Sequence, residues 1–250
     1  KNFFNDHSLF KKKNIVTVNT KNKWMNVCDF LKTSDNRRFY HRGHPILKRF
    51  DDNLNEKKLT ISKFAKISAN AGLWFVDPDI DSFERLTQEF KVVGKKSPLD
   101  KNNFLIPHKS TYSVFNSQNT SFTHSSLFAY FLLDIGDKPK TYLASHHNFR
   151  YDDIWASIIF QKISKLMNYY VSYGKPYVYQ IRNPHNFKQD VCREHIPLMM
   201  TDKFADTIIS LDVNKSSTFL GTYENLINKL EKSINSKKLK LNSIENEIFK

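Results

Sequence analysis

The sequence predicts an α/β domain with a helical extension at its C-terminus; an α+β arrangement is the open alternative. Strand-like and helix-like patterns alternate along most of the chain, which is typical of strands and helices packed in layers. The segment from Asp152 to about Met167 repeats apolar residues with the 3.6-residue period of a helix. The residues from about Tyr223 onward form an amphipathic, lysine-rich pattern, which predicts the extension.

Each expected element has its own local signal. Apolar alternation and β-branched residues predict strands at residues 14–20, 73–76, 112–116, 120–122 and 177–181. Helices are expected at residues 82–90, 125–133, 152–167 and from about 223, and a short helix at 59–71 is expected to run into the strand at 73–76. Asp81 or Ser82 is the expected N-cap of the helix at 82–90, because short polar side chains accept hydrogen bonds from the first N–H groups.

The composition indicates a globular protein. Hydrophobic residues make up 40% of the 250 residues, which is too much apolar surface for a disordered chain. Cys28 and Cys192 are far apart and show no metal-binding spacing, which argues against a disulfide scaffold or a zinc ribbon. Because no apolar run is long enough to span a membrane and the first residues lack a signal peptide's apolar core, we expect a cytoplasmic protein.

The formal net charge of +14 indicates either a lysine-rich solvated surface or an anionic partner. The candidate partners are a small anionic substrate, an anionic membrane face and nucleic acid. Nucleic acid is the weakest of these, because the lysines are dispersed and no nucleic-acid-binding motif is present, and we expect none. The segment Lys237-Lys238-Leu239-Lys240 is a candidate for peripheral membrane contact, and a solvated helix is the simpler interpretation.

Five short clusters concentrate the residue types that chemistry requires. They are Arg42-Gly43-His44-Pro45 with Arg49, Asp77-Pro78-Asp79-Ile80-Asp81, Phe115–Thr120, Arg150–Trp155 and Arg182–Asn186. In the fourth cluster, Asp152 and Asp153 begin the strongest helix pattern, near the positive end of its dipole. Adjacent carboxylates in a pocket tend to separate their pKa values, which suits one of them to act as a general base. Helix capping is the alternative role, and the flanking Tyr151 and Trp155 favour a site by offering faces on which a sugar can stack.

The run Asp77-Pro78-Asp79 has the spacing of an Asp-x-Asp motif, which holds Mn²⁺ or Mg²⁺ on the diphosphate of a sugar nucleotide. An ordinary turn between a strand and a helix is the alternative, because Asp and Pro are frequent there. His185 is a candidate metal or phosphate ligand, although a lone histidine is more often structural.

Amide and guanidinium side chains are the remaining candidates for binding a substrate. Asn116, Gln118 and Asn119 carry the paired donors and acceptors that hydroxyl-rich ligands require. Arg42 and Arg49 are candidates for neutralising a diphosphate, since guanidinium groups bind phosphate in a bidentate manner. Each of these residues alone is more often part of a turn or of the solvated surface.

In this order, the clusters resemble the reversibly glycosylated polypeptide family (UDP-arabinopyranose mutases) and the related STELLO-type glycosyltransferases. The family carries an Arg-Gly-aromatic-Pro stretch ending in Arg, a Gly-Leu-Trp segment before an acidic turn, an Asn-containing strand before Phe, and an Arg-Tyr-Asp-Asp-Met-Trp motif. The similar segments here are Arg42 to Arg49, Gly72-Leu73-Trp74 through Asp81, Asn119 to Phe122, and Arg150 to Trp155. Phe115–Thr120 and Arg182–Asn186 are closer to the STELLO-type proteins, and the resemblance covers roughly residues 15–195.

The resemblance implies a GT-A-like mixed sheet flanked by helices, which uses a nucleotide-sugar donor and a divalent metal (Mn or Mg). In the family the metal-binding Asp-x-Asp lies upstream of the Arg-Gly-x-Pro stretch, so Asp77 and Asp79 are not expected to be that motif. The chain is therefore expected to lack part of the nucleotide-binding half. We expect residues 1–200 to form the catalytic and acceptor half of the domain and residues 201–250 to form the extension.

The resemblance also implies roles for individual residues. Asp152 or Asp153 would be the general base of sugar transfer. The substrate-binding candidates are Arg42, Arg49, Trp74, Asn116, Gln118, Asn119, Arg150 and Trp155. Arg42 and Arg49 match family arginines, one of which carries the sugar reversibly in the mutases, but His44 replaces the family's aromatic residue.

Three functions follow as hypotheses. The first is a glycosyltransferase that transfers a sugar to a glycan or lipid-linked acceptor in polysaccharide synthesis, at or near an anionic membrane surface. The second is a mutase that interconverts pyranose and furanose rings of a nucleotide sugar. The third is a basic scaffold subunit that keeps the fold but has lost the donor site.

Overall fold

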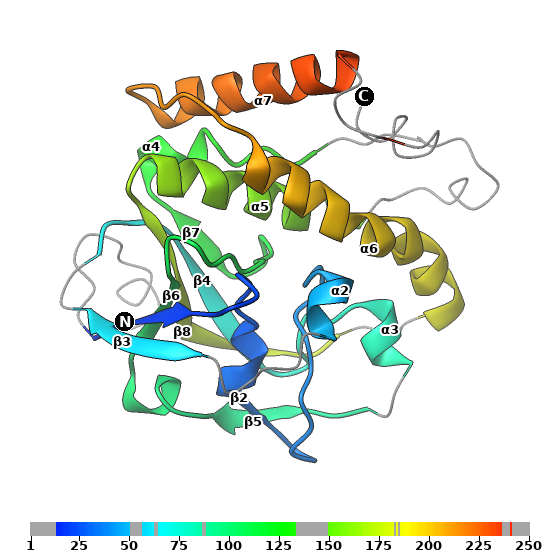
Figure 1. Cartoon of the computed structure of the whole chain (residues 1–250). Helices are drawn as coiled ribbons and strands as arrows, with labels where there is room; N and C mark the ends of the chain where they lie inside the picture. The colour runs from blue at the N-terminus through cyan, green and yellow to red at the C-terminus, as the bar shows by residue number, and fades with distance from the viewer. Residues whose placement is uncertain are drawn as a thin grey trace.

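One mixed sheet with helices packed against it forms the architecture (Figure 1). The computed structural model describes residues 14–50, 57–62, 65–86, 89–133, 150–182, 184, 186–236 and 241. The strands are β1 (Ile15–Asn19), β2 (Leu31–Thr33), β3 (Lys58–Ser62), β4 (Ile67–Val76), β5 (Val92–Lys95), β6 (Phe104–Pro107), β7 (Thr120–Phe122) and β8 (Tyr170–Gln180). Their order is β2-β5-β4-β8-β6-β1-β3, and β7 pairs with β4. The predicted α/β class is confirmed.

The two longest strands, β4 and β8, lie side by side at the centre of the sheet and run parallel. β1 and β6 are also parallel, whereas β6 pairs with β8 in the antiparallel direction. The register of β4 and β8 shifts between Gly72 and Leu73, where the side-chain amide of Asn119 donates to the carbonyls of Leu73 and Pro176 at 3.2 and 3.0 Å. Asn119 therefore satisfies backbone groups at an irregular point of the sheet.

The helices gather mainly on one side of the sheet, where α5, α6 and α7 lie above it in Figure 1. The α-helices are α2 (Ile46–Arg49), α3 (Ser82–Arg85), α4 (His124–Leu127), α5 (Asp152–Leu166), α6 (Phe187–Ser210) and α7 (Phe219–Asn235), and the 3₁₀ helices are η1 (Val27–Phe30) and η3 (Leu99–Lys101). α5 is almost fully buried, because its apolar period places Ile154, Ile158 and Ile163 in the core. No helix among the described residues is long and apolar enough to cross a membrane.

Several expected elements are confirmed. β1 and β7 occupy the strands expected at 14–20 and 120–122, and α5 occupies the helix expected from Asp152. α7 forms the amphipathic C-terminal helix, with Leu226 buried. Asp81 is the N-cap of α3, since its carboxylate accepts hydrogen bonds from the backbone N–H groups of Phe83 and Glu84 at 3.1 and 3.0 Å.

Other expected elements are wrong in length or type. The expected helix at 59–71 is replaced by strands, because β3 pairs along its length with β1 and β4 begins at Ile67. The helix expected at 82–90 ends at Arg85, and Phe90 packs instead against the ring of Phe39 at 4.9 Å. The helix expected at 125–133 is limited to α4, and residues 113–116 form no regular strand. β8 is longer than the strand expected at 177–181.

Helix α6 was not expected, and it crosses the proposed boundary between residues 200 and 201. Its interior contains Pro197, a residue that usually ends or kinks a helix. The ring of Trp155 stacks on Phe204 at 4.2 Å and donates a hydrogen bond to Thr201 at 2.9 Å, which fastens α6 to α5. Phe204 and Leu226 belong to the same hydrophobic core as Ile154, so residues on both sides of that boundary pack together.

Candidate active site

The site begins where β4 leaves the sheet. Val76 has a φ of 72°, a left-handed conformation that is unusual for a β-branched residue. The chain then runs through three aspartates, and each has a different partner. Asp77 accepts from the backbone N–H of Arg182 at 3.0 Å, Asp81 caps α3, and Asp79 is buried at 1% exposure beside Arg42.

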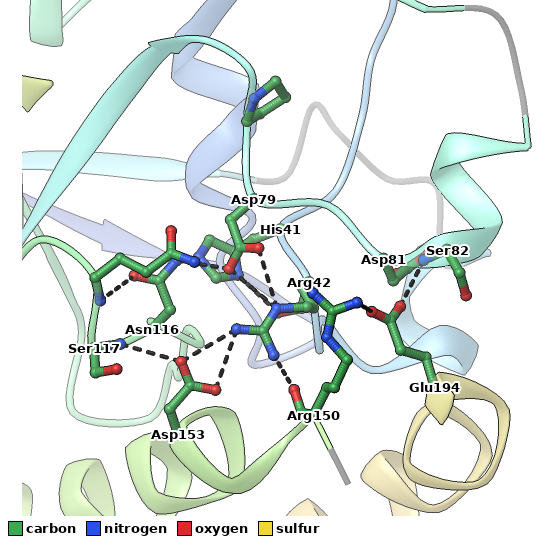
Figure 2. Close-up of polar contacts among 12 residues, drawn as sticks. His41, Arg42, Asp79, Asp81, Ser82, Asn116, Ser117, Arg150, Asp153 and Glu194 are labelled. Atoms are coloured by element: carbon green, nitrogen blue, oxygen red, sulfur yellow. Dashed lines mark hydrogen bonds and ion pairs between the residues drawn. The ribbon is translucent and has the colours of Figure 1, made fainter. Parts of the chain in front are cut away.

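Arg42 joins the acidic turn to the start of α5, as Figure 2 shows. Its Nε lies 3.1 Å from each carboxylate oxygen of Asp79. Its Nη2 donates to both oxygens of Asp153 at 3.2 and 3.1 Å, and its Nη1 donates to the carbonyl of Arg150. The guanidinium is therefore committed to protein groups, which argues against the expected role of Arg42 in neutralising a diphosphate.

Gly43 explains why the Arg42 loop can approach α5. It has a φ of 77°, and a Cβ placed there would lie 2.2 Å from Cγ2 of Ile154. Only glycine fits this conformation and this distance without a shift of the neighbours.

We expect Gly43→Ala to lower the free energy of unfolding by at least about 1–3 kcal/mol, because the added methyl group overpacks against Ile154. Urea denaturation measures this change. Gly94→Ala is the matched control, since the Cβ there would lie 3.7 Å from its nearest neighbour, and it should change stability by no more than about 0.5 kcal/mol. Equal stability of the two variants would contradict this account.

Asp79 is held ionised by three donors. Besides Arg42, it accepts from Nη2 of Arg182 at 3.0 Å and from the side-chain amide of Asn116 at 2.6 Å. Burial alone would raise the pKa of Asp79, but the charges of Arg42 and Arg182 and the Asn116 hydrogen bond hold that pKa well below its ordinary value. His41, which the sequence does not single out, is buried beside Asp79 and Arg42. Burial lowers the pKa of His41.

The depressed pKa of Asp79 predicts a dependence of stability on acid. A carboxyl group whose folded-state pKa is lowered contributes stability above its unfolded value of about 3.9, and this contribution is lost as the pH falls toward the folded value. We expect the free energy of unfolding to decrease below about pH 4, and to decrease less steeply in Asp79→Asn. Denaturation curves at several pH values measure the slope, and an identical slope in both proteins would refute the assignment to Asp79.

The two carboxylates at the start of α5 have different surroundings. Asp153 is 7% exposed and, besides Arg42, accepts from the backbone N–H of Ser117 at 3.2 Å. Asp152 is half-buried, and burial together with the neighbouring charge of Asp153 raises its pKa. Asp153 is thus fixed in an ion pair, whereas Asp152 is the better proton acceptor of the two.

A shallow cavity of about 220 Å³ opens over this network. Its lining comes from all five sequence clusters together with one apolar residue: Arg42, Asp79, Ser117, Gln118, Leu132, Arg150, Asp152, Asp153 and Arg182. Arg150 is a third exposed at its side chain and pairs with Asp190 at 2.6 Å. Arg150 and Arg182 are the cations placed to meet an anionic ligand, and Gln118 offers an exposed amide.

Several predicted site residues lie elsewhere. Trp155 and Trp74 are 2% and 1% exposed and pack in the core, so neither offers a face to a sugar, and the same holds for the fully buried Tyr151. The side-chain amide of Asn119 donates to backbone carbonyls of the sheet and does not line the cavity. Arg49 is paired with Asp81 and with the carbonyl of His44, and it does not line the cavity. His185 and the segment 237–240 lie outside the described residues.

Arg182 lies at the site but is not among the candidates that the sequence predicts. It begins the fifth cluster, Arg182–Asn186, and no feature of that cluster distinguishes a functional arginine from a surface one. Its role depends on β8 running parallel to β4, so that the ends of both strands meet and Arg182 reaches Asp79. Only the pairing of these two distant strands reveals this contact.

A divalent metal needs several oxygen, nitrogen or sulfur ligands that converge on one point. In the part of the chain that the structure describes, no three His, Cys, Asp or Glu side chains do so. Asp79 and Asp153 are already paired with Arg42 and Arg182, which leaves Asp152 as the one lining carboxylate without an ion pair among the described residues. The described residues therefore do not fit the metal that the resemblance implies.

The comparisons with known proteins add no assignment. No protein-family model matches the chain, and no curated protein matches it.

Proposed function

We propose that the chain is a GT-A-like glycosyltransferase, which transfers a sugar from a nucleotide-sugar donor to a glycan or lipid-linked acceptor. The observation that carries the proposal is one cavity lined by Arg42, Asp79, Asp152 and Asp153, in which Arg42 pairs with Asp79 and Asp153. These residues come from the separate clusters in which the chain resembles nucleotide-sugar enzymes.

In the proposed reaction, Asp152 acts as the general base. A hydroxyl of the acceptor attacks the anomeric carbon of the donor and loses its proton to the Asp152 carboxylate. The bond between that carbon and the diphosphate oxygen breaks, and its electron pair leaves with the nucleoside diphosphate. Arg150 and Arg182 would stabilise the negative charge that develops on the leaving group, because guanidinium groups form charge-assisted hydrogen bonds with phosphate oxygens.

The positions of the remaining charges support this division of roles. Arg42 holds the Asp153 carboxylate in place through an ion pair, so Asp153 acts as a positioning residue for the start of α5. The hydroxyl of Tyr130 donates to the backbone carbonyl of Asp153 at 3.1 Å, which adds a further constraint on this turn. Asp152 is held beside the cavity by a backbone that cannot easily move.

The test is a transfer assay with a panel of nucleotide sugars and mono- or oligosaccharide acceptors. We expect the wild-type chain to release nucleoside diphosphate in the presence of an acceptor, and Asp152→Asn to release far less. Equal turnover in the two proteins would reject Asp152 as the base. Ring interconversion of a nucleotide sugar without any acceptor would instead identify a mutase, for which the burial of Arg49 away from the cavity offers no support.

A non-catalytic scaffold is the second candidate. The observation that favours it is that Asp79 and Asp153 are already paired with Arg42 and Arg182, which leaves few carboxylates for a donor-bound metal. A scaffold of this kind would not bind a nucleotide sugar. Calorimetric titration with UDP-sugars separates the two candidates, because saturable binding would exclude a degenerate donor site.

A further inference from the structure

A second, larger cleft adjoins the candidate active site. Its volume is about 620 Å³, which falls within the range of roughly 300–1,000 Å³ that is usual for small-molecule pockets. The cleft is lined by the turn after β4, by α3, by the residues before β5, and by the chain between β8 and α6. Arg182 lines both cavities, so they meet at this residue.

The backbone at the edge of the cleft is strained. Val76 lines it with a φ of 72°, and the following N–H of Asp77 is held by the carbonyl of Gln180 at 3.2 Å. A β-branched residue adopts such a conformation only where its surroundings enforce it, and such residues cluster at ligand sites. This strain turns the chain out of the sheet and creates one wall of the cleft.

Two arginines supply positive charge to the cleft. The side chain of Arg182 is 12% exposed, and its Nε is buried without a hydrogen-bond partner among the described residues. Arg85 donates to the carbonyl of Pro78 at 3.3 Å, and burial together with the nearby charge of Arg182 lowers its pKa. Two guanidinium groups that repel each other beside a donor without a partner form a site that an anion would stabilise.

The acidic residues of the cleft are mostly engaged with other groups. Asp77 accepts from the backbone N–H of Arg182, and Glu84 lies 3.6 Å from the Arg49 guanidinium. Glu89 and Lys91 are exposed at the rim, where solvent screens their opposite charges. The lining thus holds three acidic and three basic residues, and Arg85 and Arg182 are the cations in its less exposed part.

The cleft also has apolar lining residues. Ile80 and Phe90 are buried there at 6% and 7% exposure. Ile181 and Phe187 line the mouth and are 86% and 45% exposed. Because two large apolar side chains stay exposed on a cleft that also contains two arginines, a ligand with one anionic end and one apolar end would contact both kinds of side chain.

We propose that this cleft binds a phosphate-bearing amphiphile. The phosphate would contact the guanidinium groups of Arg85 and Arg182, and the apolar chain would lie along Ile181 and Phe187. This site adjoins the proposed transferase centre at Arg182, and its occupation requires no sugar transfer.

The experiment titrates the protein with octyl phosphate below its critical micelle concentration, followed by calorimetry. Octanol and inorganic phosphate are titrated in parallel, and vesicles of phosphatidylcholine with phosphatidic acid test a membrane source of the same headgroup. We expect octyl phosphate to bind saturably, at one site, and more tightly than either fragment. Ile181→Ser and Arg85→Gln should each weaken this binding by about tenfold or more.

Matched controls separate the cleft from general surface effects. Ile61→Ser removes an isoleucine of similar exposure, 82%, from β3, and Lys229→Gln removes a positive charge from the exposed face of α7. Both should leave the affinity for octyl phosphate unchanged. If Arg85→Gln does not fold, Ile181→Ser still decides the result, because its side chain is almost fully exposed.

Three outcomes would overturn the proposal. The first is that no saturable binding of octyl phosphate occurs. The second is that octanol binds as tightly as octyl phosphate, which would remove the anion site. The third is that only the vesicles bind and Ile181→Ser binds them as wild type does, which would assign the phosphate to a membrane surface outside this cleft. If the wild-type chain shows no sugar transfer, the proposed function fails, but the result of the octyl phosphate titration still stands.

Discussion

Replacing Arg42 with alanine is expected to lower the free energy of unfolding by roughly 3–5 kcal/mol. The variant leaves the carboxylates of Asp79 and Asp153 buried without their common cation, since these residues are 1% and 7% exposed. Removing one partner of a buried pair costs much more than removing the whole pair, because the remaining charge stays desolvated. Urea denaturation followed by circular dichroism measures the change.

Arg38→Ala is the matched control for this prediction. Arg38 also pairs with an aspartate, Asp29, at 2.8 Å, but its side chain is 29% exposed. Asp29 keeps a second cation, Lys57, and a hydrogen bond from Asn26, so this variant leaves no buried carboxylate unpaired and should lose much less stability than Arg42→Ala. In addition, Asp79→Asn combined with Arg42→Met should recover part of the stability lost in Arg42→Ala, because fewer buried charges are then unpaired. Similar losses in Arg42→Ala and Arg38→Ala would show that the network does not stabilise the fold.

The second large effect is expected in catalysis. Asp152→Asn should lower the rate of sugar transfer by about 10²–10⁴, the range attributed to a general base. The binding of the donor should change little, since the amide keeps the size of the side chain and the arginines stay in place. Because burial and Asp153 raise the pKa of Asp152, the wild-type rate should also fall on acidification at a pH above the ordinary range of an aspartate.

Two further variants sharpen this result. Asp206→Asn changes an exposed aspartate of α6 and should leave the rate unchanged. Asp153→Asn should reduce both the rate and the stability, because its partner Arg42 then loses a carboxylate. A rate in Asp152→Asn within a factor of two of wild type would remove Asp152 from the mechanism and would favour a scaffold.

The sequence predicted those elements whose signals are local. The apolar period of α5 and the capping side chain of Asp81 depend on neighbouring residues alone, and both are confirmed. Helix α6 was missed because Pro197 and its many polar residues obscure the helical period. Edge strand β3 was read as a helix because its stabilising partner, β1, lies far away in the sequence.

At the site, too, residues with a local signal were predicted and contacts between distant segments were not. Asp153 and Arg42 are candidates from the sequence and line one cavity, and Asn116 donates a hydrogen bond to Asp79 of the same lining. Trp155 was misassigned because a sequence cannot distinguish an aromatic side chain in the core from one at a ligand site. Arg182 reaches Asp79 only because β4 and β8 are parallel neighbours, and that pairing is not encoded in any short segment.

The most direct test of the proposed function is the binding of a nucleotide sugar at the cavity over Arg42. Calorimetric titration with UDP-sugars should give saturable, one-site binding that weakens by about tenfold or more in Arg150→Gln. Arg38→Gln, whose arginine does not line the cavity, should bind as wild type does. If no nucleotide sugar binds saturably to the wild-type chain, the cavity is not a donor site and the proposed glycosyltransferase function is wrong.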